Sequence, residues 1–241
     1  MSTMIAVGIG TVFLAAFLGG MTGFGYNLVS TPLLLLLGVL PATAVAVNLA
    51  IAMFTRVVVV LRLGQYVRWR RALPMTAGSV PGLVLGGIVG GLIDPRGIRI
   101  VAGVLVLVVA PLLMVRRPKP GDKSPARYAL AGFAGGALGT TTSLNGVPPA
   151  LTLAADARDQ RSFLADLAVY FVLSNIVGLV VLGVRDGVEV SSLVLLAWWL
   201  PGALVANWLG TWLAQRIRRD VFRVATCVLV MASGVATLVS A

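Results

Sequence analysis

Long apolar runs separated by short polar breaks dominate this chain. Most of the runs approach the roughly 20 mostly apolar residues that an α-helix needs to cross the hydrocarbon core of a bilayer. In chain order they are 4–26, 28–40, 42–61, 72–93, 98–115, 126–142, 148–155, 163–184, 190–214 and 221–239. The runs at 28–40 and 148–155 are too short to span, and each follows a polar break that contains glycine. The pattern predicts an all-α, polytopic transmembrane helical bundle with two broken or re-entrant segments.

The same short motifs occur twice along the chain, in the same order. The stretch GGMTG at 19–23 has a counterpart, GGALG, 116 positions later at 135–139. The dipeptide Pro81-Gly82 likewise has a counterpart at Pro201-Gly202. Two matches in one order indicate an internal duplication. The expected organisation is a single membrane domain at 1–241, built from a first repeat at 1–115, a polar linker at 116–127 and a second repeat at 128–241.

Composition agrees with a lipid environment. Hydrophobic residues make up 59% of the chain and charged residues 11%, whereas a soluble domain has about 45–50% and about 25%. The net charge of +11 would favour a nucleic-acid partner in a soluble protein. In a membrane protein the same excess is a topology signal, because cytoplasmic loops collect Lys and Arg. We therefore expect the lipid bilayer as a partner and no nucleic acid.

The basic residues fall in three loops, at 62–71, in the linker at 116–127 and at 216–223. All three loops become cytoplasmic if each repeat opens with a segment that enters and leaves on one side, followed by three spans. Each repeat then crosses the membrane an odd number of times, so the two repeats are inverted and both termini lie outside. Inverted repeats of this kind are common in secondary transporters.

The chain lacks the residues that several kinds of metal, cofactor and catalytic site require. The chain has no histidine, and its one cysteine, Cys227, lies in an apolar run. The usual zinc and haem ligand sets and the histidine-based catalytic triads are therefore missing. No phosphate-binding G-x-x-x-x-G-K-[ST] loop occurs either. We expect no enzyme activity, no cofactor, no metal and no ATP-driven pump.

The two polar breaks are the strongest candidates for a binding site. Each combines glycine, hydroxyl or amide side chains and a proline, which suits the first turn of a helix. The free N–H groups at such a helix start carry the positive end of the helix dipole, so two of them meeting near the midplane would bind a small anion. The alternative is that glycine and proline only permit kinks and close packing. The candidate substrate-binding residues are Gly23, Asn27, Ser30, Thr31 and Pro32 in the first break, and Gly139, Thr140, Thr141, Ser143, Asn145 and Pro148 in the second.

Polar residues inside the long runs form a second group of candidates. Asn48 and Arg56 lie on one stripe of a predicted helix, and an offset of 118 positions superposes them on Asp166 and Ser174. A charge that far from a helix end is a functional candidate, so Arg56 and Asn48 are predicted to bind substrate. Asp166 is predicted either to exchange protons and so couple transport to them, or to pair with Arg56. The alternatives are that Arg56 extends to the basic loop and that Asp166 caps a helix.

These motifs resemble one family of membrane proteins. The segment GGMTGFGYNLVSTPLL at 19–34, its counterpart after Gly135 and the PGxxxG motif at Pro81 resemble the TauE/SafE sulfite exporter family over nearly the whole chain. The resemblance implies a permease of a bacterial or archaeal inner membrane for sulfite, sulfonates such as sulfoacetate, or other small organic anions. Tyr26 and Asn27 stand where many members carry further glycines, which predicts an altered pocket.

Together these observations predict a secondary transporter that moves a small anion, with sulfite or an organosulfonate as candidates, by alternating access. Two other functions stay open: a passive anion channel and a membrane scaffold subunit that transports nothing. The paired breaks argue against a scaffold, which has no use for free helix ends within the bilayer. Coupling to protons or another ion and assembly into a homo-oligomer are compatible with the sequence, which selects neither.

Overall fold

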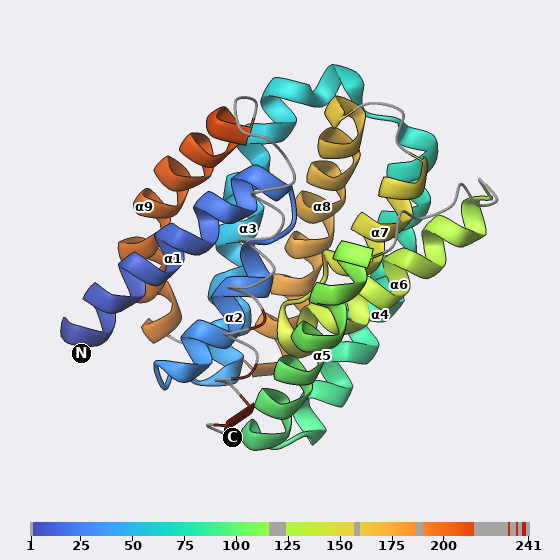
Figure 1. Cartoon of the computed structure of the whole chain (residues 1–241). Helices are drawn as coiled ribbons and strands as arrows, with labels where there is room; N and C mark the ends of the chain where they lie inside the picture. The colour runs from blue at the N-terminus through green and yellow to red at the C-terminus, as the bar shows by residue number, and fades with distance from the viewer. Residues whose placement is uncertain are drawn as a thin grey trace.

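The computed structural model describes residues 2–115, 124–156, 160–186 and 190–214, together with 231, 235, 238 and 239. Within these ranges every regular element is a helix (Figure 1). The elements are α1 Ser2–Thr22, α2 Tyr26–Leu36, α3 Pro41–Leu63, the 3-10 turn η1 Gly64–Tyr66, α4 Trp69–Leu92, α5 Pro95–Val115, α6 Pro125–Thr142, α7 Val147–Asp156, α8 Gln160–Asp186 and α9 Val190–Ala214. Most of the linker, the third basic loop and Cys227 lie outside the described residues.

Five of the described helices are long and apolar enough to cross a membrane. The spans are Ile5–Thr22, Pro41–Tyr66, Trp69–Leu92, Gln160–Arg185 and Ser191–Leu213. Many large apolar side chains on them face outward, among them Leu61, Leu92 and Val184, each more than 80% exposed. Such surfaces are stable against lipid tails and costly in water. The predicted all-α, polytopic membrane protein is confirmed.

Both predicted helix interruptions are present. After α1, Gly23 adopts a positive φ of 89°, and the Thr22 hydroxyl accepts a hydrogen bond from the Gly25 N–H at 2.8 Å. After α6, Ser143 adopts a left-handed φ of 59° while its N–H donates to the Gly139 carbonyl at 2.9 Å. A left-handed residue ends a helix because the following N–H groups can no longer continue the hydrogen-bond ladder. The short helices α2 and α7 restart directly after these breaks.

One detail of the expectation is wrong. Pro32 was expected to begin its half-helix, but α2 begins at Tyr26 and Pro32 lies inside it. The position of the break is set by Gly23, whose backbone conformation suits glycine, and Gly23 precedes the proline by more than two turns. Pro148 does lie in the first turn of α7.

Helix pairs far apart in the sequence lie side by side. α1 packs along α9, and α4 packs along α6 (Figure 1). Glycines allow both approaches: a Cβ at Gly82 would overlap the Phe133 carbonyl oxygen, and one at Gly210 would overlap the Phe17 carbonyl oxygen. Backbones can meet this closely only where side chains are absent, as in other small-residue membrane interfaces.

The central pair, α3 and α8, runs antiparallel. Near the start of α3, Val45 packs with Leu182 near the end of α8. Further along, the Asn175 side chain donates to the Leu49 carbonyl at 3.1 Å. Beyond the end of α3, the backbone N–H of Arg68 donates to Asp166, near the start of α8. Residues later in α3 thus contact residues earlier in α8, as expected for antiparallel helices.

Candidate functional site

The two interruptions meet in a buried network of neutral polar side chains, with Asn48 at its centre. The Asn48 Oδ1 atom accepts hydrogen bonds from the Ser30 hydroxyl at 2.6 Å and the Tyr26 hydroxyl at 3.0 Å. Its Nδ2 atom donates to Thr31 Oγ1 at 3.1 Å and to Ser143 Oγ at 3.4 Å. Asn48 is completely buried, so these bonds replace water as partners of its amide. The network thus joins α2 and α3 to the second interruption.

Direct bonds also connect the two breaks. The hydroxyls of Thr31 and Ser143 lie 2.5 Å apart. The Asn27 Nδ2 atom donates to the Ser143 carbonyl at 2.6 Å and to Asn145 Oδ1 at 3.2 Å. Residues more than 110 positions apart in the sequence therefore share one hydrogen-bonded site.

The network continues into α8. The Asn145 Nδ2 atom donates to Asn175 Oδ1 at 2.6 Å, and the Tyr170 hydroxyl donates to the Asn145 carbonyl at 3.3 Å. Asn145, Tyr170 and Asn175 are each completely buried. Through the bond from Asn175 to Leu49, the network returns to α3. The antiparallel pair of central helices thus holds both interruptions.

Arg56 lies farther along the same stripe of α3, and its side chain is only 3% exposed. Its Nη2 atom donates to the Gly19 carbonyl at 2.9 Å, and its guanidinium lies 5.8 Å from the centre of the Phe171 ring. Gly19 packs directly on Tyr26 at the first interruption, and Phe171 packs on Gly146 at the second. Arg56 is therefore buried between the two breaks rather than extended to the basic end of α3.

No carboxylate of the described residues pairs with Arg56. Its recorded partners are one carbonyl and one aromatic ring, which are weak compensation for a buried full charge. A desolvated cation with so little compensation favours an anion as a further partner.

Comparison with known proteins identifies the family of the chain. The family model described as sulfite exporter TauE/SafE matches residues 8–237. The chain belongs to the TauE/SafE sulfite exporter family. Searches of curated proteins and of solved structures each found no match. The residues matched to TauE/SafE include both interruptions, the central helices and the interface glycines. The whole described site therefore belongs to the family domain.

Asp166, near the start of α8 in this TauE/SafE protein, contacts the residues at the start of α4. Its Oδ1 atom accepts the Arg68 N–H at 2.6 Å at the start of α4, and its Oδ2 atom lies 3.7 Å from Arg71 Nη1. The carboxylate is completely buried. Its geometry is that of a helix cap with an adjacent cation, and its recorded ion pair is with Arg71 rather than Arg56.

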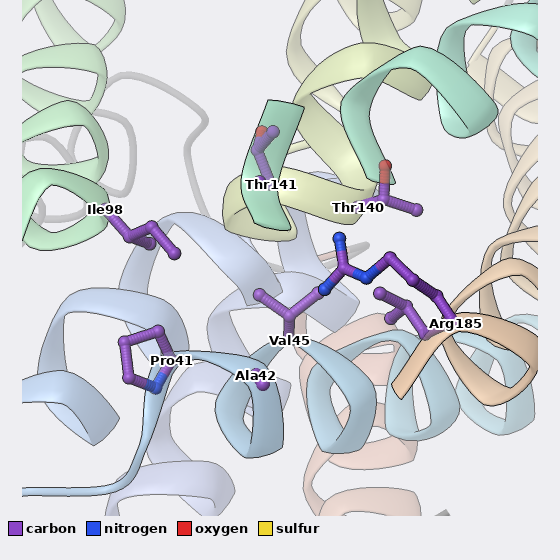
Figure 2. Close-up of a pocket in the computed structure, with 9 residues that line it drawn as sticks. Pro41, Ala42, Val45, Ile98, Thr140, Thr141 and Arg185 are labelled. Atoms are coloured by element: carbon purple, nitrogen blue, oxygen red, sulfur yellow. The ribbon is translucent and has the colours of Figure 1, made fainter. Parts of the chain in front are cut away.

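Other candidate residues of this TauE/SafE protein lie beside the network. The Thr140 hydroxyl donates to the Leu83 carbonyl at 2.7 Å and the Thr141 hydroxyl to the Ala137 carbonyl at 2.9 Å. Both threonines line a cavity of about 50 Å³ at the start of α3, and Arg185 extends toward it (Figure 2). The remaining candidates act through packing: Gly139 lies against Asn145, Gly23 lies against Leu164, and Pro148 is half-buried in α7.

Sequence reasoning missed three contributors to the TauE/SafE site. Tyr26 was noted only as a departure from the family motif, although its hydroxyl bonds the central Asn48. Phe171 gave no signal, because an aromatic residue in an apolar run looks like any packing residue. Arg185 gave no signal either, because it directly follows a long apolar run and nothing in that pattern reveals a cavity. In the described ranges, no group of three His, Cys, Asp or Glu residues could hold a metal.

Proposed function

We propose that this protein is a secondary transporter of a small anion, with sulfite or an organosulfonate as candidate substrates, and that it works by alternating access. The observation that carries the proposal is the burial of Arg56 between two helix interruptions, without a carboxylate partner among the described residues. Membership of a sulfite exporter family supports the same class of substrate.

Electrostatics makes an anion the natural occupant of this site. Removing a guanidinium from water costs several kcal/mol, and one carbonyl and one ring offset only part of that cost. An oxyanion beside Arg56 would form charge-assisted hydrogen bonds, about twice as strong as neutral ones. Substrate binding and compensation of the buried charge would then be the same event.

The neutral network would supply the rest of the site. Its amide and hydroxyl groups are small and can exchange partners, so the bonds between Asn27, Thr31 and Ser143 can be replaced by bonds to an oxyanion. Six of the candidate residues take part in the network. They are Asn27, Ser30, Thr31, Asn48, Ser143 and Asn145. Gly23, Pro32, Gly139, Thr140, Thr141 and Pro148 would shape the adjoining backbone.

Two inverted repeats would provide the alternating access. Under the offset of 118 positions, α3 corresponds to α8, and these helices run antiparallel. Under the same offset, α1 corresponds to α6 and α4 corresponds to α9. The packed pair of α1 and α9 therefore corresponds to the packed pair of α6 and α4. Repeats at 1–115 and 128–241, joined by a linker at 116–127, account for this pattern. Rocking of one repeat against the other would open the site to each side in turn.

Orientation and energy supply belong to the same proposal. The protein would lie in the inner membrane with its basic loops in the cytoplasm and both termini outside. A substrate or ion gradient would drive it, and Asp166 would take up or release a proton at the end where Arg68 and Arg71 hold it.

The test is flux of labelled sulfite into proteoliposomes. The wild type should show saturation and counterflow, which a carrier has and a passive channel lacks. Arg56→Ala should reduce flux at least about tenfold, the loss expected when a hydrogen bond to a charged group is removed. Arg62→Ala, a change to an exposed arginine on the same helix, is the matched control and should retain flux.

Three results would contradict the proposal. Normal flux in Arg56→Ala would remove the role of Arg56. Non-saturating flux without counterflow would favour a channel. Absence of flux in the wild type for sulfite, sulfonates and carboxylates alike would favour a scaffold subunit.

A further inference from the structure

Arg56 stands apart from the ion pair that the described structure buries. Among the described residues whose side-chain burial is given, the buried charged side chains are Arg56, Arg71 and Asp166. Arg71 and Asp166 form an ion pair with 3.7 Å between Nη1 and Oδ2. Arg56 contacts a carbonyl and an aromatic ring instead, so its positive charge is the one that a substrate could balance.

The groups that face Arg56 are neutral on every element for which a contact is recorded. α1 presents the Gly19 carbonyl, and α8 presents the Phe171 ring. The neighbouring network consists of amides and hydroxyls from α2, α3, α8 and the loop after α6. No second cation within the described part of the chain reinforces the positive charge of Arg56 there.

We infer that the site selects oxyanions with one negative charge over oxyanions with two. This inference rests on the proposed function and adds the charge of the substrate to it. A singly charged oxyanion and Arg56 form a neutral pair, whereas a doubly charged one leaves an excess negative charge in a low-dielectric interior. Hydrogen sulfite and simple alkyl sulfonates fit this class, whereas sulfate and sulfoacetate, which each carry two charges, do not.

Two features of the site agree with this charge class. The buried Oδ1 atom of Asn27 has no hydrogen-bond partner. As an acceptor it can bind the O–H group of a protonated oxyanion such as hydrogen sulfite. Phe171 and Phe24 both lie against Gly146, so this part of the protein is apolar and would suit the alkyl group of a sulfonate.

The experiment compares matched anions that differ by one charge. Methanesulfonate is compared with sulfate, and acetate with oxalate, by titration calorimetry of the purified wild-type protein in sodium-free buffer. In the pair that binds, the singly charged ion should bind about 100-fold more tightly, the ratio that corresponds to one uncompensated charge in a spanning helix. The Arg56→Gln variant should lose binding of that ion, and the Arg62→Gln control should keep it.

The outcomes separate this inference from the proposed function. If sulfate or oxalate binds as tightly as its singly charged counterpart, the charge selection is wrong while the anion transporter stands. If none of the four ions nor labelled sulfite binds, the proposed function fails and the inference fails with it. Sulfite flux gives a second readout: it should fall as the pH rises and hydrogen sulfite loses its proton, while methanesulfonate flux stays constant.

Discussion

At the scale of residues, one asparagine connects most of the polar groups of the site. Asn48 bonds Tyr26, Ser30, Thr31 and Ser143 through its two amide atoms. A buried amide with every partner satisfied stabilises one arrangement of its neighbours, because each lost bond leaves a polar group without water. Asn48 therefore positions both interruptions at once.

The Asn48→Leu variant should be less stable and should transport poorly. Its hydrogen-bond partners would stay buried but lose their acceptor or donor. Each group left unsatisfied should lower the free energy of unfolding by about 1–3 kcal/mol. A thermal unfolding scan in detergent and a flux assay measure the two effects. Thr55→Val is the control, since Thr55 is buried on the same helix and bonds only backbone carbonyls of its own helix. Equal effects of the two changes would contradict a special role for Asn48.

The network residues were predictable because the two breaks carry polar side chains at matching places in a duplicated sequence. Asn27, Thr31, Ser143 and Asn145 all belong to those breaks, and all take part in the network. The bond partners were not predictable in the same way. That Arg56 lies over Phe171 depends on the packing of α3 against α8, which no local pattern encodes.

At the scale of elements, glycine determines both the breaks and the close helix pairs. The sequence predicted the short helices within a few residues, but it assigned the start of α2 to Pro32 instead of the glycines before it. Proline is a strong local signal, and the positive φ of Gly23 can be recognised only from backbone geometry. The pairs α1–α9 and α4–α6 depend on glycines in the same physical way, through close backbone approach.

Adding a side chain at one such glycine should separate α4 from α6. The Cβ of Gly82→Val would overlap backbone atoms of Phe133 and Ala137, and backbone cannot move aside as a flexible side chain can. We expect a loss of at least about 1–3 kcal/mol, typical of overpacked sites, seen as a lower unfolding temperature in detergent. Gly10→Val is the control, since a Cβ at Gly10 meets no atom within 4 Å. Equal stability of the two variants would show that this approach is not tight.

At the scale of the whole molecule, the site lies where the two halves of the chain meet. The recorded bonds between Thr31 and Ser143, and between Asn27 and Asn145, all join the first half to the second. They consist of hydroxyl and amide groups, whose individual contribution is about 1 kcal/mol, so movement of one half against the other can break them. A site of this kind can form and open as the halves rock, which is the physical requirement of alternating access.

The central claim is that the two helix interruptions touch inside the membrane, and a disulfide across them tests it most directly. With Cys227→Ser as background, the double variant Thr31→Cys and Ser143→Cys is oxidised in native membranes and analysed by mass spectrometry of its peptides. Hydroxyls 2.5 Å apart predict a disulfide in high yield. The control pair Thr55→Cys and Ser143→Cys should stay reduced, since Thr55 lies about two turns beyond Asn48 on α3. Absence of the disulfide in the Thr31 and Ser143 pair, in a correctly inserted protein, would contradict the account.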